Sequence, residues 1–372
     1  MKNKQALLQP FTIGTLEMPN RVVMAPMTRS RADNEQRAPT LELQGVYYAQ
    51  RASAGLIITE GSQISKEAVG YINTPGIHSK EQVEGWRKVT EKVHEAGGRI
   101  FIQLWHVGRI SHPDFHDGNL PLAPSALNPE ATVYTPEGEK QTVTPKAMTK
   151  EDIKRTVSDF VNASKNALDA GFDGVEIHAS NGYLLHQFFS STSNHRTDEY
   201  GGSHENKSRI LFEIIDGIKK VMQEDKIGVR LNPSLHGIFG MTLDEDSIPT
   251  FDYIIKKLND YNLAYLHLSE PFNDVSEVPH AITKIAERYR PMHNGTLMIS
   301  TNFDQEKGNV VLEKENADLV SFAKQYISNP DLVERFEHHA ALSDWDQETF
   351  YTTGKKGYTD YTTMYKKSKI NS

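Results

Sequence analysis

The sequence predicts an α/β protein that folds as a (β/α)8 barrel, the TIM-barrel architecture. Eight short runs rich in apolar and β-branched residues alternate with longer stretches of helical periodicity. The runs are apolar throughout, which is typical of parallel strands covered by helices. An open doubly wound sheet is the alternative, but it would leave two strand edges unpaired, and no Gly-x-Gly-x-x-Gly follows the first run. We therefore expect the sheet to close into a barrel.

The predicted strands and the signals of the helices between them follow one another along the chain. The eight strands are Arg21–Pro26, Leu56–Glu60, Arg99–Leu104, Gly174–His178, Ile227–Leu231, Ala264–Ser269, Leu297–Ser300 and Leu319–Ala323. Two helices are expected to begin at capping boxes, Ser79 with Gln82 and Thr149 with Asp152. Left-handed glycines are expected just before three strands, at Gly55, at Gly97 or Gly98, and at Gly171.

Three segments do not fit the alternating pattern. Residues 11–18 are expected to form a hairpin around Gly14 that plugs the bottom of the barrel. The stretch 111–148 is too long for an ordinary βα loop, and its segments 131–135 and 140–144 are expected to pair as a second hairpin on the C-terminal rim. Residues 350–365 are expected to wrap back over that rim. Together with the barrel these segments are expected to make one domain, residues 1–372.

Composition and charge exclude several classes of protein. With 41 basic and 49 acidic residues the net charge is −8, and no basic patch stands out, so we expect neither nucleic acid nor a membrane surface as a partner. The absence of cysteine excludes disulfides, thiolate metal sites and iron–sulfur clusters. The first residues lack the apolar run of a signal peptide, and no window approaches the ~20 apolar residues of a membrane span. A cytoplasmic location is therefore expected.

The residues at the strand ends indicate the kind of ligand, because barrel active sites lie at this end. No His-x-His follows the first strand and no carboxylates recur at the strand ends, so no metal is expected. Only Lys324 follows a strand directly, which gives a Schiff-base enzyme little support. Uncharged hydrogen-bonding groups, one arginine and aromatic rings remain, and they suit a planar ligand with an amide-like edge, such as an isoalloxazine.

Each of these residues also has a purely structural interpretation. Gln103 could pair with the flavin pyrimidine or satisfy backbone groups inside the barrel. Arg230 could stabilise negative charge on a reduced flavin or pair with a carboxylate such as Glu60. His178 and Asn181 could donate together to one carbonyl oxygen while Tyr183 supplies a proton. The same three could instead be a core histidine, a turn asparagine and a rim tyrosine, although their clustering within six residues favours a site.

Four segments resemble the old yellow enzyme family of FMN-dependent oxidoreductases. They are residues 20–32, 103–105, 178–209 and 326–336, and the resemblance extends from about Phe11 to Tyr361. It implies a barrel that holds FMN noncovalently, is reduced by NADPH or NADH, and passes hydride to an electron-poor alkene in the same pocket. The multidomain dienoyl-CoA reductase relatives do not fit, because the chain has no cysteine for their cluster and no room for their extra domain.

The resemblance also implies roles for individual residues. The FMN contacts would be Pro26, Met27, Thr28, Gly61, Gln103, Arg230, Thr301, Asn302, Ala323 and Lys324. His178 and Asn181 would hold the substrate carbonyl or the nicotinamide amide, and Tyr183 would be the proton donor. The substrate cavity would be lined by Tyr71, Trp105, Phe239 and Tyr351.

Four positions depart from the family pattern. Ala323 and Lys324 stand where a Gly-Arg pair is usual, so the phosphate loses a bidentate guanidinium but keeps a positive charge. Thr301 replaces a usual glycine beside Asn302, although backbone amides there can still bind phosphate. Gly61 stands where small residues such as alanine are common, a change from which we expect little effect.

Three functions remain open at this point. The first is reduction of the C=C bond of α,β-unsaturated carbonyl compounds. The second is reduction of nitrate esters or nitroaromatics on the same flavin. The third is a binding barrel that has lost FMN through its altered phosphate site.

Overall fold

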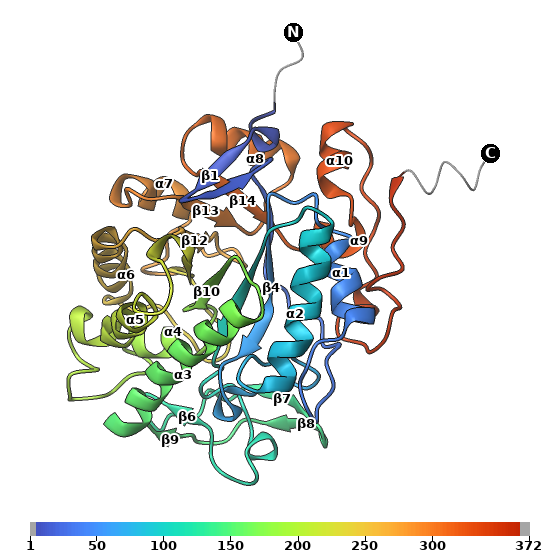
Figure 1. The fold of residues 1–372 in the computed structure, drawn as a ribbon. Coiled ribbons are helices and arrows are strands. Elements are labelled where there is room, and N and C mark those ends of the chain that lie inside the picture. Colours follow the sequence, from blue (N-terminus) through green and yellow to red (C-terminus); the bar gives the residue numbers. More distant parts are fainter. Residues whose placement is uncertain (1–4, 365–372) are drawn as a thin grey trace.

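A computed structural model describes residues 5–364 and contains the expected barrel of eight parallel strands (Figure 1). In barrel order the strands are β3 (Val22–Met24), β4 (Leu56–Gln63), β5 (Ile100–Trp105), β10 (Gly174–His178), β11 (Ile227–Leu231), β12 (Tyr265–Ser269), β13 (Leu297–Ser300) and β14 (Leu319–Phe322). β14 pairs with β3 and closes the sheet. The open-sheet alternative is therefore excluded.

All eight predicted strands are confirmed, with differences only at their ends. β3 stops at Met24, because Pro26 has no N–H with which to extend the ladder. β4 runs three residues past the predicted end at Glu60, and its register with β5 shifts between Ile58 and Gly61. This irregularity lies where the sequence placed a flavin contact.

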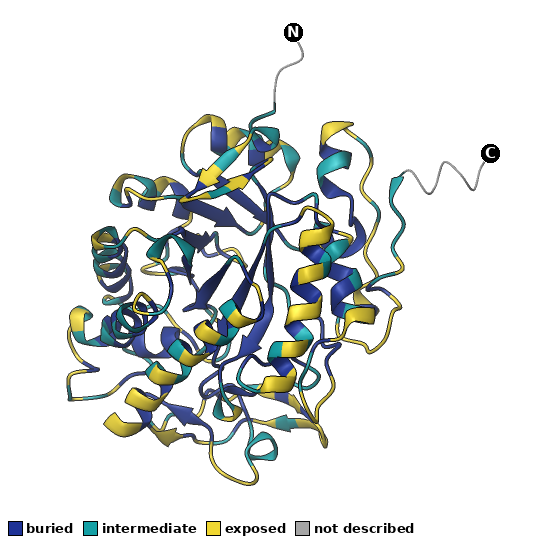
Figure 2. Ribbon diagram, in the orientation of Figure 1, coloured by how far each residue is buried: buried dark blue, intermediate teal, exposed yellow. Residues whose placement is uncertain are grey.

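Ten α-helices of the described chain surround the barrel. They are α1 (Val46–Ala49), α2 (Lys80–Glu95), α3 (Lys150–Asp169), α4 (Leu184–Phe189), α5 (His204–Ile218), α6 (Ser247–Lys257), α7 (Ile285–Tyr289), α8 (Gln305–Glu313), α9 (Lys324–Ser328) and α10 (Leu332–Glu337). Most of them bury an inner face against uniformly buried strands and expose an outer face (Figure 2), whereas α4 is buried at every residue. Both predicted capping boxes are present, at the starts of α2 and α3.

The predicted glycine caps are confirmed at two of three places. Gly97 and Gly171 adopt left-handed φ angles of 77° and 81° just after α2 and α3. The prediction for Gly55 is wrong, since its φ is not left-handed. There glycine is needed because a Cβ would collide with the backbone carbonyl of Asn20.

The N-terminal hairpin closes the bottom of the barrel, as predicted. β1 (Phe11–Ile13) pairs antiparallel with β2 (Leu16–Met18). Ile13 and Met18 are buried in a cluster with inward-facing barrel residues that include Phe101, Tyr265 and Met298. The barrel interior therefore has an apolar floor at this end.

The long insertion lies at that other end of the barrel, opposite β1 and β2 (Figure 1). β7 (Thr132–Thr135) and β8 (Gly138–Gln141) form the predicted rim hairpin, with a turn at residues 136–137 that is tighter than expected. A second small sheet joins β6 (Leu122–Ala123) to β9 (Lys146–Ala147), which the sequence did not indicate. The insertion is thus a folded wall beside the strand ends.

The segment 349–358, which we call the C-terminal strap, returns to the rim. Arg29, which follows β3 closely, donates from Nε to the carbonyl of Phe350 at 3.1 Å and from Nη2 to that of Gly357 at 2.8 Å. Arg31 donates to the carbonyls of Thr349 and Phe350, both at 2.8 Å. The expectation that the tail wraps over the rim is confirmed for residues 350–358. Residues 362–364 instead lie at α10, where the backbone N–H of Met364 donates to Asp331 at 2.6 Å, and Tyr365 lies outside the described residues.

Candidate active site

His178 ends β10 and presents a hydrogen-bond donor to the strand-end site. The backbone N–H and the hydroxyl of Ser180 lie 3.4 and 3.2 Å from its Nδ1, so this nitrogen acts as the acceptor. Burial, and next the charge of Arg230, hold the pKa of His178 well below its usual value. A neutral imidazole with an accepting Nδ1 carries its proton on Nε2. His178 is therefore a neutral donor.

Asn181 is fixed as a second donor. It lies in the turn between β10 and α4 with a left-handed φ of 57°, a conformation that asparagine tolerates better than most residues. Its Oδ1 accepts a hydrogen bond of 3.1 Å from Nδ2 of the fully buried Asn232. Because the oxygen is engaged, the amide nitrogen of Asn181 is left to donate, and no acceptor for it occurs among residues 5–364.

Tyr183 is surrounded by the aromatic residues that the sequence placed in the substrate cavity. Its hydroxyl lies 2.9 Å from that of Tyr71, and its ring meets Trp105 edge to face at 5.0 Å and Phe239 at 5.7 Å. The Trp105 ring stacks in turn over His178 at 6.1 Å. Burial, and next Tyr71, raise the pKa of Tyr183 well above its usual value, so its phenol stays protonated at neutral pH.

Tyr351, the fourth predicted cavity residue, stands at the edge of this group. It lies on the C-terminal strap, it is 66% exposed, and it makes a small electrostatic contribution to the raised pKa of Tyr71 and Tyr183. The strap therefore brings it close to the two tyrosines. Pro26, Met27 and Thr28 are half-buried in the segment that follows β3.

Arg230 lies beside His178, since the two residues are paired in register across β10 and β11. It is 6% exposed, and within the described chain its Nε has no hydrogen-bond partner. Its guanidinium makes one hydrogen bond to the described residues, a long one of 3.4 Å from Nη2 to the hydroxyl of Ser269. The suggested pairing with Glu60 is wrong, because that carboxylate accepts from the backbone N–H of Arg29 instead.

The carboxylate that faces Arg230 is Glu176, two residues before His178 on β10. Its Oε1 accepts from Nε2 of Gln103 at 2.7 Å, and its Oε2 lies 2.8 Å from Nδ1 of His267. Neither Glu176 nor His267 was predicted from the sequence. The strand period of two could have indicated Glu176, because it places Glu176 on the same side of its strand as His178. The same period places Arg230 and Asn232 on one side of the next strand.

Gly61 matters more than the sequence suggested. A Cβ at this position would lie 2.7 Å from Cε3 of Trp105, so alanine would displace the indole. The expectation that glycine here changes little is therefore wrong for a chain that carries Trp105. The missing side chain keeps the Trp105 ring next to His178 and Tyr183.

The predicted phosphate residues lie at the ends of two neighbouring strands. Thr301 and Asn302 follow β13 with left-handed φ angles of 77° and 61°, and they line a cavity of about 620 Å³. Ala323 and Lys324 follow β14, the next strand of the barrel. Lys324 is exposed, and its Nζ lies 5.9 Å from the ring of Trp345.

The residues at the centre of the site fit the pyrimidine edge of FMN. The buried guanidinium of Arg230 lacks a partner for Nε and can stabilise negative charge on a reduced ring. Gln103 uses one amide hydrogen for Glu176, which leaves an N–H and the carbonyl oxygen as a neighbouring donor and acceptor. Among the described residues, no group of three His, Asp or Glu could hold a metal ion.

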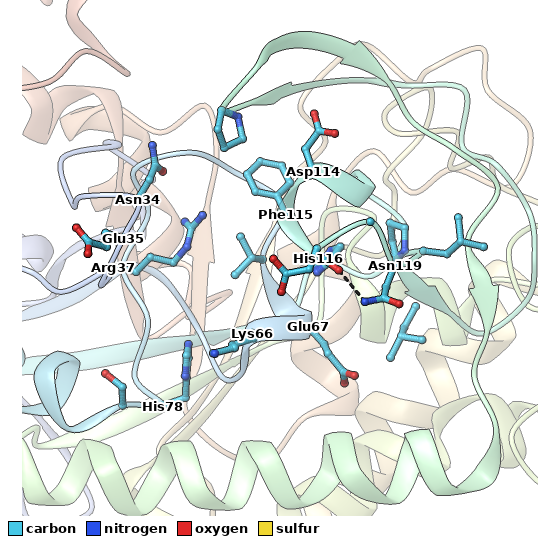
Figure 3. A pocket seen from close by; sticks show the side chains of 18 of the residues that line it. Asn34, Glu35, Arg37, Lys66, Glu67, His78, Asp114, Phe115, His116 and Asn119 are labelled. Atoms are coloured by element: carbon cyan, nitrogen blue, oxygen red, sulfur yellow. Dashed lines mark hydrogen bonds between the residues drawn. The ribbon is translucent and has the colours of Figure 1, made fainter.

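A large cavity of about 1080 Å³ lies outside this site (Figure 3). Its lining includes Arg37, Lys66, His78 and His116, and none of the predicted site residues. It is nevertheless adjacent, because Nη1 of Arg37 donates to the backbone carbonyl of Tyr71 at 3.0 Å. Arg37 therefore connects the lining of this cavity to the loop that carries Tyr71.

Fold and site together define a flavin oxidoreductase of the α/β-barrel class, and comparison with known proteins identifies its family. The sequence profile of the NADH:flavin oxidoreductase / NADH oxidase family matches residues 6–343. The chain belongs to this family, which is the old yellow enzyme family.

Two relatives match over nearly their whole length. 12-Oxophytodienoate reductase 1 of Oryza sativa subsp. japonica is 39% identical over 95% of this chain and 92% of its own. The flavin oxidoreductase hxnT of Emericella nidulans is 39% identical over 96% of this chain and 97% of its own.

Solved structures agree in fold. Morphinone reductase is 42% identical, with a TM-score of 0.90 over 97% of this chain and 96% of its own, and it has also been solved in complex with tetrahydroNAD. The old yellow enzyme homologue from Zymomonas mobilis is 39% identical, with a TM-score of 0.91 over 96% of this chain and 99% of its own. Within residues 5–364, no helix has the length and apolar character needed to cross a membrane.

Proposed function

We propose that this flavin oxidoreductase reduces the C=C bond of α,β-unsaturated carbonyl compounds with NADPH or NADH as the reductant. The observation that carries the proposal is the pair of fixed neutral donors, His178 Nε2 and Asn181 Nδ2, beside a phenol that stays protonated. The family implies FMN as the cofactor. Bound at this site, FMN would supply the hydride-transfer chemistry between the nicotinamide and the β-carbon of the alkene.

The donor pair polarises the substrate. A carbonyl oxygen that accepts from His178 and Asn181 gains negative charge as hydride arrives at the β-carbon, and the two hydrogen bonds strengthen at that moment. Both donors are held by partners outside the site, Ser180 and Asn232, so little reorganisation is needed. The same donors suit the carboxamide of a nicotinamide, which allows one pocket to serve both reactants.

Tyr183 completes the reduction by giving its proton to the α-carbon. The phenolate that remains is stabilised by the hydroxyl of Tyr71, whose oxygen lies 2.9 Å away. Trp105, Phe239 and Tyr351 line the apolar part of the pocket in this proposal. The rings of Trp105 and Phe239 would exclude water from the reacting carbons.

FMN would be held along the strand ends. Gln103, Arg230 and Gly61 would meet the pyrimidine edge, and Pro26, Met27 and Thr28 would line the ring. Thr301, Asn302, Ala323 and Lys324 would meet the phosphate, with Lys324 as the single cationic side chain of that group.

The test begins with the visible spectrum of the purified protein after incubation with excess FMN. We expect bound flavin that NADPH or NADH bleaches without oxygen and that 2-cyclohexenone then reoxidises. Reoxidation by a nitrate ester with release of nitrite, and none by the enone, would replace the proposal with the second function. A protein that stays colourless in excess FMN would overturn both functions.

A further inference from the structure

A charged group that the proposed reaction does not use lies directly below the site. Glu176 is fully buried inside the barrel, between the apolar floor and the strand ends. An isolated carboxylate in such a place would be very unfavourable. The groups around Glu176 must therefore stabilise this carboxylate.

The surroundings of Glu176 stabilise its ionised form. Burial alone would raise the pKa of Glu176, but His267, Arg230 and Gln103 together hold it below its usual value. Burial, and next Arg230, lower the pKa of His267, so this histidine is a neutral donor. Its Nε2 lies 2.8 Å from the hydroxyl of Ser321, which can donate to it and leave Nδ1–H to bond Glu176. The phenol of Tyr265 also faces the carboxylate, and its pKa is raised well above its usual value by burial and then by Glu176.

We propose that Glu176 is a positioning residue for FMN with two separate effects. It fixes the side-chain amide of Gln103, and it offsets the positive charge of Arg230, so that bound FMN has a lower reduction potential than Arg230 alone would give. The inference rests on the proposed function, because it requires FMN at Gln103 and Arg230.

The first effect follows from hydrogen bonding. The 2.7 Å bond from Gln103 Nε2 to Glu176 Oε1 sets the orientation of an amide that could otherwise rotate by half a turn. In this orientation the amide oxygen stays available to accept from a ring N–H. Loss of the bond would weaken binding of oxidised and reduced FMN alike.

The second effect follows from charge. A reduced flavin carries negative charge at N1, which Arg230 stabilises more than it stabilises the neutral oxidised ring. A carboxylate close to Arg230 cancels part of that field, and it does so strongly because both groups are buried. With Glu176 in place, the reduced flavin would therefore be a stronger hydride donor than with Arg230 alone.

Two holoenzyme variants separate these effects. E176Q removes the charge but keeps the hydrogen bonds. Its amide oxygen can still accept from Gln103, and its amide nitrogen can donate to Nδ1 of His267 when that histidine carries its proton on Nε2. We expect its reduced FMN to bind at least tenfold more tightly relative to oxidised FMN, a rise in potential of about 30 mV for a two-electron couple. E176D keeps the charge but withdraws the oxygen from Gln103, so we expect weaker binding of oxidised FMN and a smaller change in potential.

The measurements are the reduction potential against a reference dye and the dissociation constant of oxidised FMN. The control is E139Q on the exposed rim hairpin, which should change neither. A wild-type potential in E176Q would overturn the charge effect, and an unchanged FMN dissociation constant in E176D would overturn the positioning effect. If E176Q does not fold, the E176D dissociation constant still decides whether Glu176 positions Gln103.

Failure of the proposed function gives a different result. Wild-type protein that binds no FMN, or that binds FMN and does not reduce enones, contradicts that function before any variant is made. Wild-type protein that reduces enones while E176Q and E176D behave like it contradicts only the role of Glu176.

Discussion

The hydroxyl oxygens of Tyr71 and Tyr183 lie 2.9 Å apart, so the two phenols share one hydrogen bond. Either oxygen can be the donor. In the proposed reaction Tyr183 gives up a proton, and Tyr71 would then be the donor that stabilises the phenolate. The pair therefore links a wall residue of the pocket to the proposed proton donor.

Tyr183→Phe is expected to slow alkene reduction by about 10²- to 10⁴-fold, the usual contribution of a general acid. Reduction of the flavin by NAD(P)H should change little, because that half-reaction needs no proton from Tyr183. Stopped-flow absorbance of each half-reaction measures the difference. Tyr71→Phe is the matched control and should cause a smaller loss in the alkene step, whereas equal losses of Tyr183→Phe in both steps would remove Tyr183 from the donor role.

Asn232→Ala is expected to raise KM for both the enone and the nicotinamide about fivefold. The change removes the hydrogen bond that orients Asn181, and one such bond is worth about 1 kcal/mol. Steady-state kinetics with each reactant, together with a thermal unfolding curve to confirm the fold, provide the measurement. An unchanged KM for both would show that Asn181 keeps its orientation without Asn232.

Lys324→Ala is expected to weaken FMN binding by about tenfold or less, because an exposed charge contributes only about 1 kcal/mol. Lys324→Arg should strengthen binding, since a guanidinium can form two parallel bonds to phosphate. Fluorescence titration of the apoprotein with FMN gives both constants. If Lys324→Ala binds FMN like the wild type, the backbone amides near Thr301 and Asn302 hold the phosphate without the lysine.

Gly61→Ala is expected to lower the unfolding free energy by about 1–3 kcal/mol, the usual cost of overpacking a buried site. The added methyl would displace the Trp105 indole and disturb its contacts with His178 and Tyr183. Urea unfolding monitored by tryptophan fluorescence measures this cost. Gly61→Ala combined with Trp105→Phe should recover part of it, and a double variant no more stable than the single one would contradict the proposed collision.

Glu60→Gln is expected to alter the pH dependence of stability. Burial raises the pKa of Glu60 to about 7, above its value in the unfolded chain. The folded state therefore binds more protons, and the unfolding free energy falls as pH rises from about 4.5 to 7, by up to about 3 kcal/mol. Denaturant unfolding at pH 5 and pH 8 should show this fall in the wild type and in the exposed control Glu139→Gln but not in Glu60→Gln. Equal falls in all three proteins would show that Glu60 titrates normally.

The barrel was predictable because the evidence for it is local. Apolar runs such as Ile227–Leu231 and capping boxes such as that of Ser79 depend on residues close in sequence, and both appear where expected. The prediction for Gly55 was wrong because glycine is required there by the close backbone of Asn20, 35 positions away, and not by the end of the preceding helix. Close approach between distant segments leaves no periodic signal.

The candidate site was predictable only in part. The positions of His178, Asn181 and Tyr183 followed from their place after a strand, but their partners did not. Asn232 and Glu176 become visible as partners only when neighbouring strands are placed in register. The effect of Gly61 on Trp105 likewise depends on the register of β4 and β5.

The hold of Arg29 and Arg31 on the C-terminal strap has a consequence for biosynthesis. Arg29 and Arg31 closely follow the first barrel strand, and the strap that they bind is translated more than 300 positions later. A nascent chain that has not yet reached residue 349 can form most of the barrel strands but lacks the strap beside the strand-end site. This side of the rim is therefore completed only after all eight barrel strands have been synthesised.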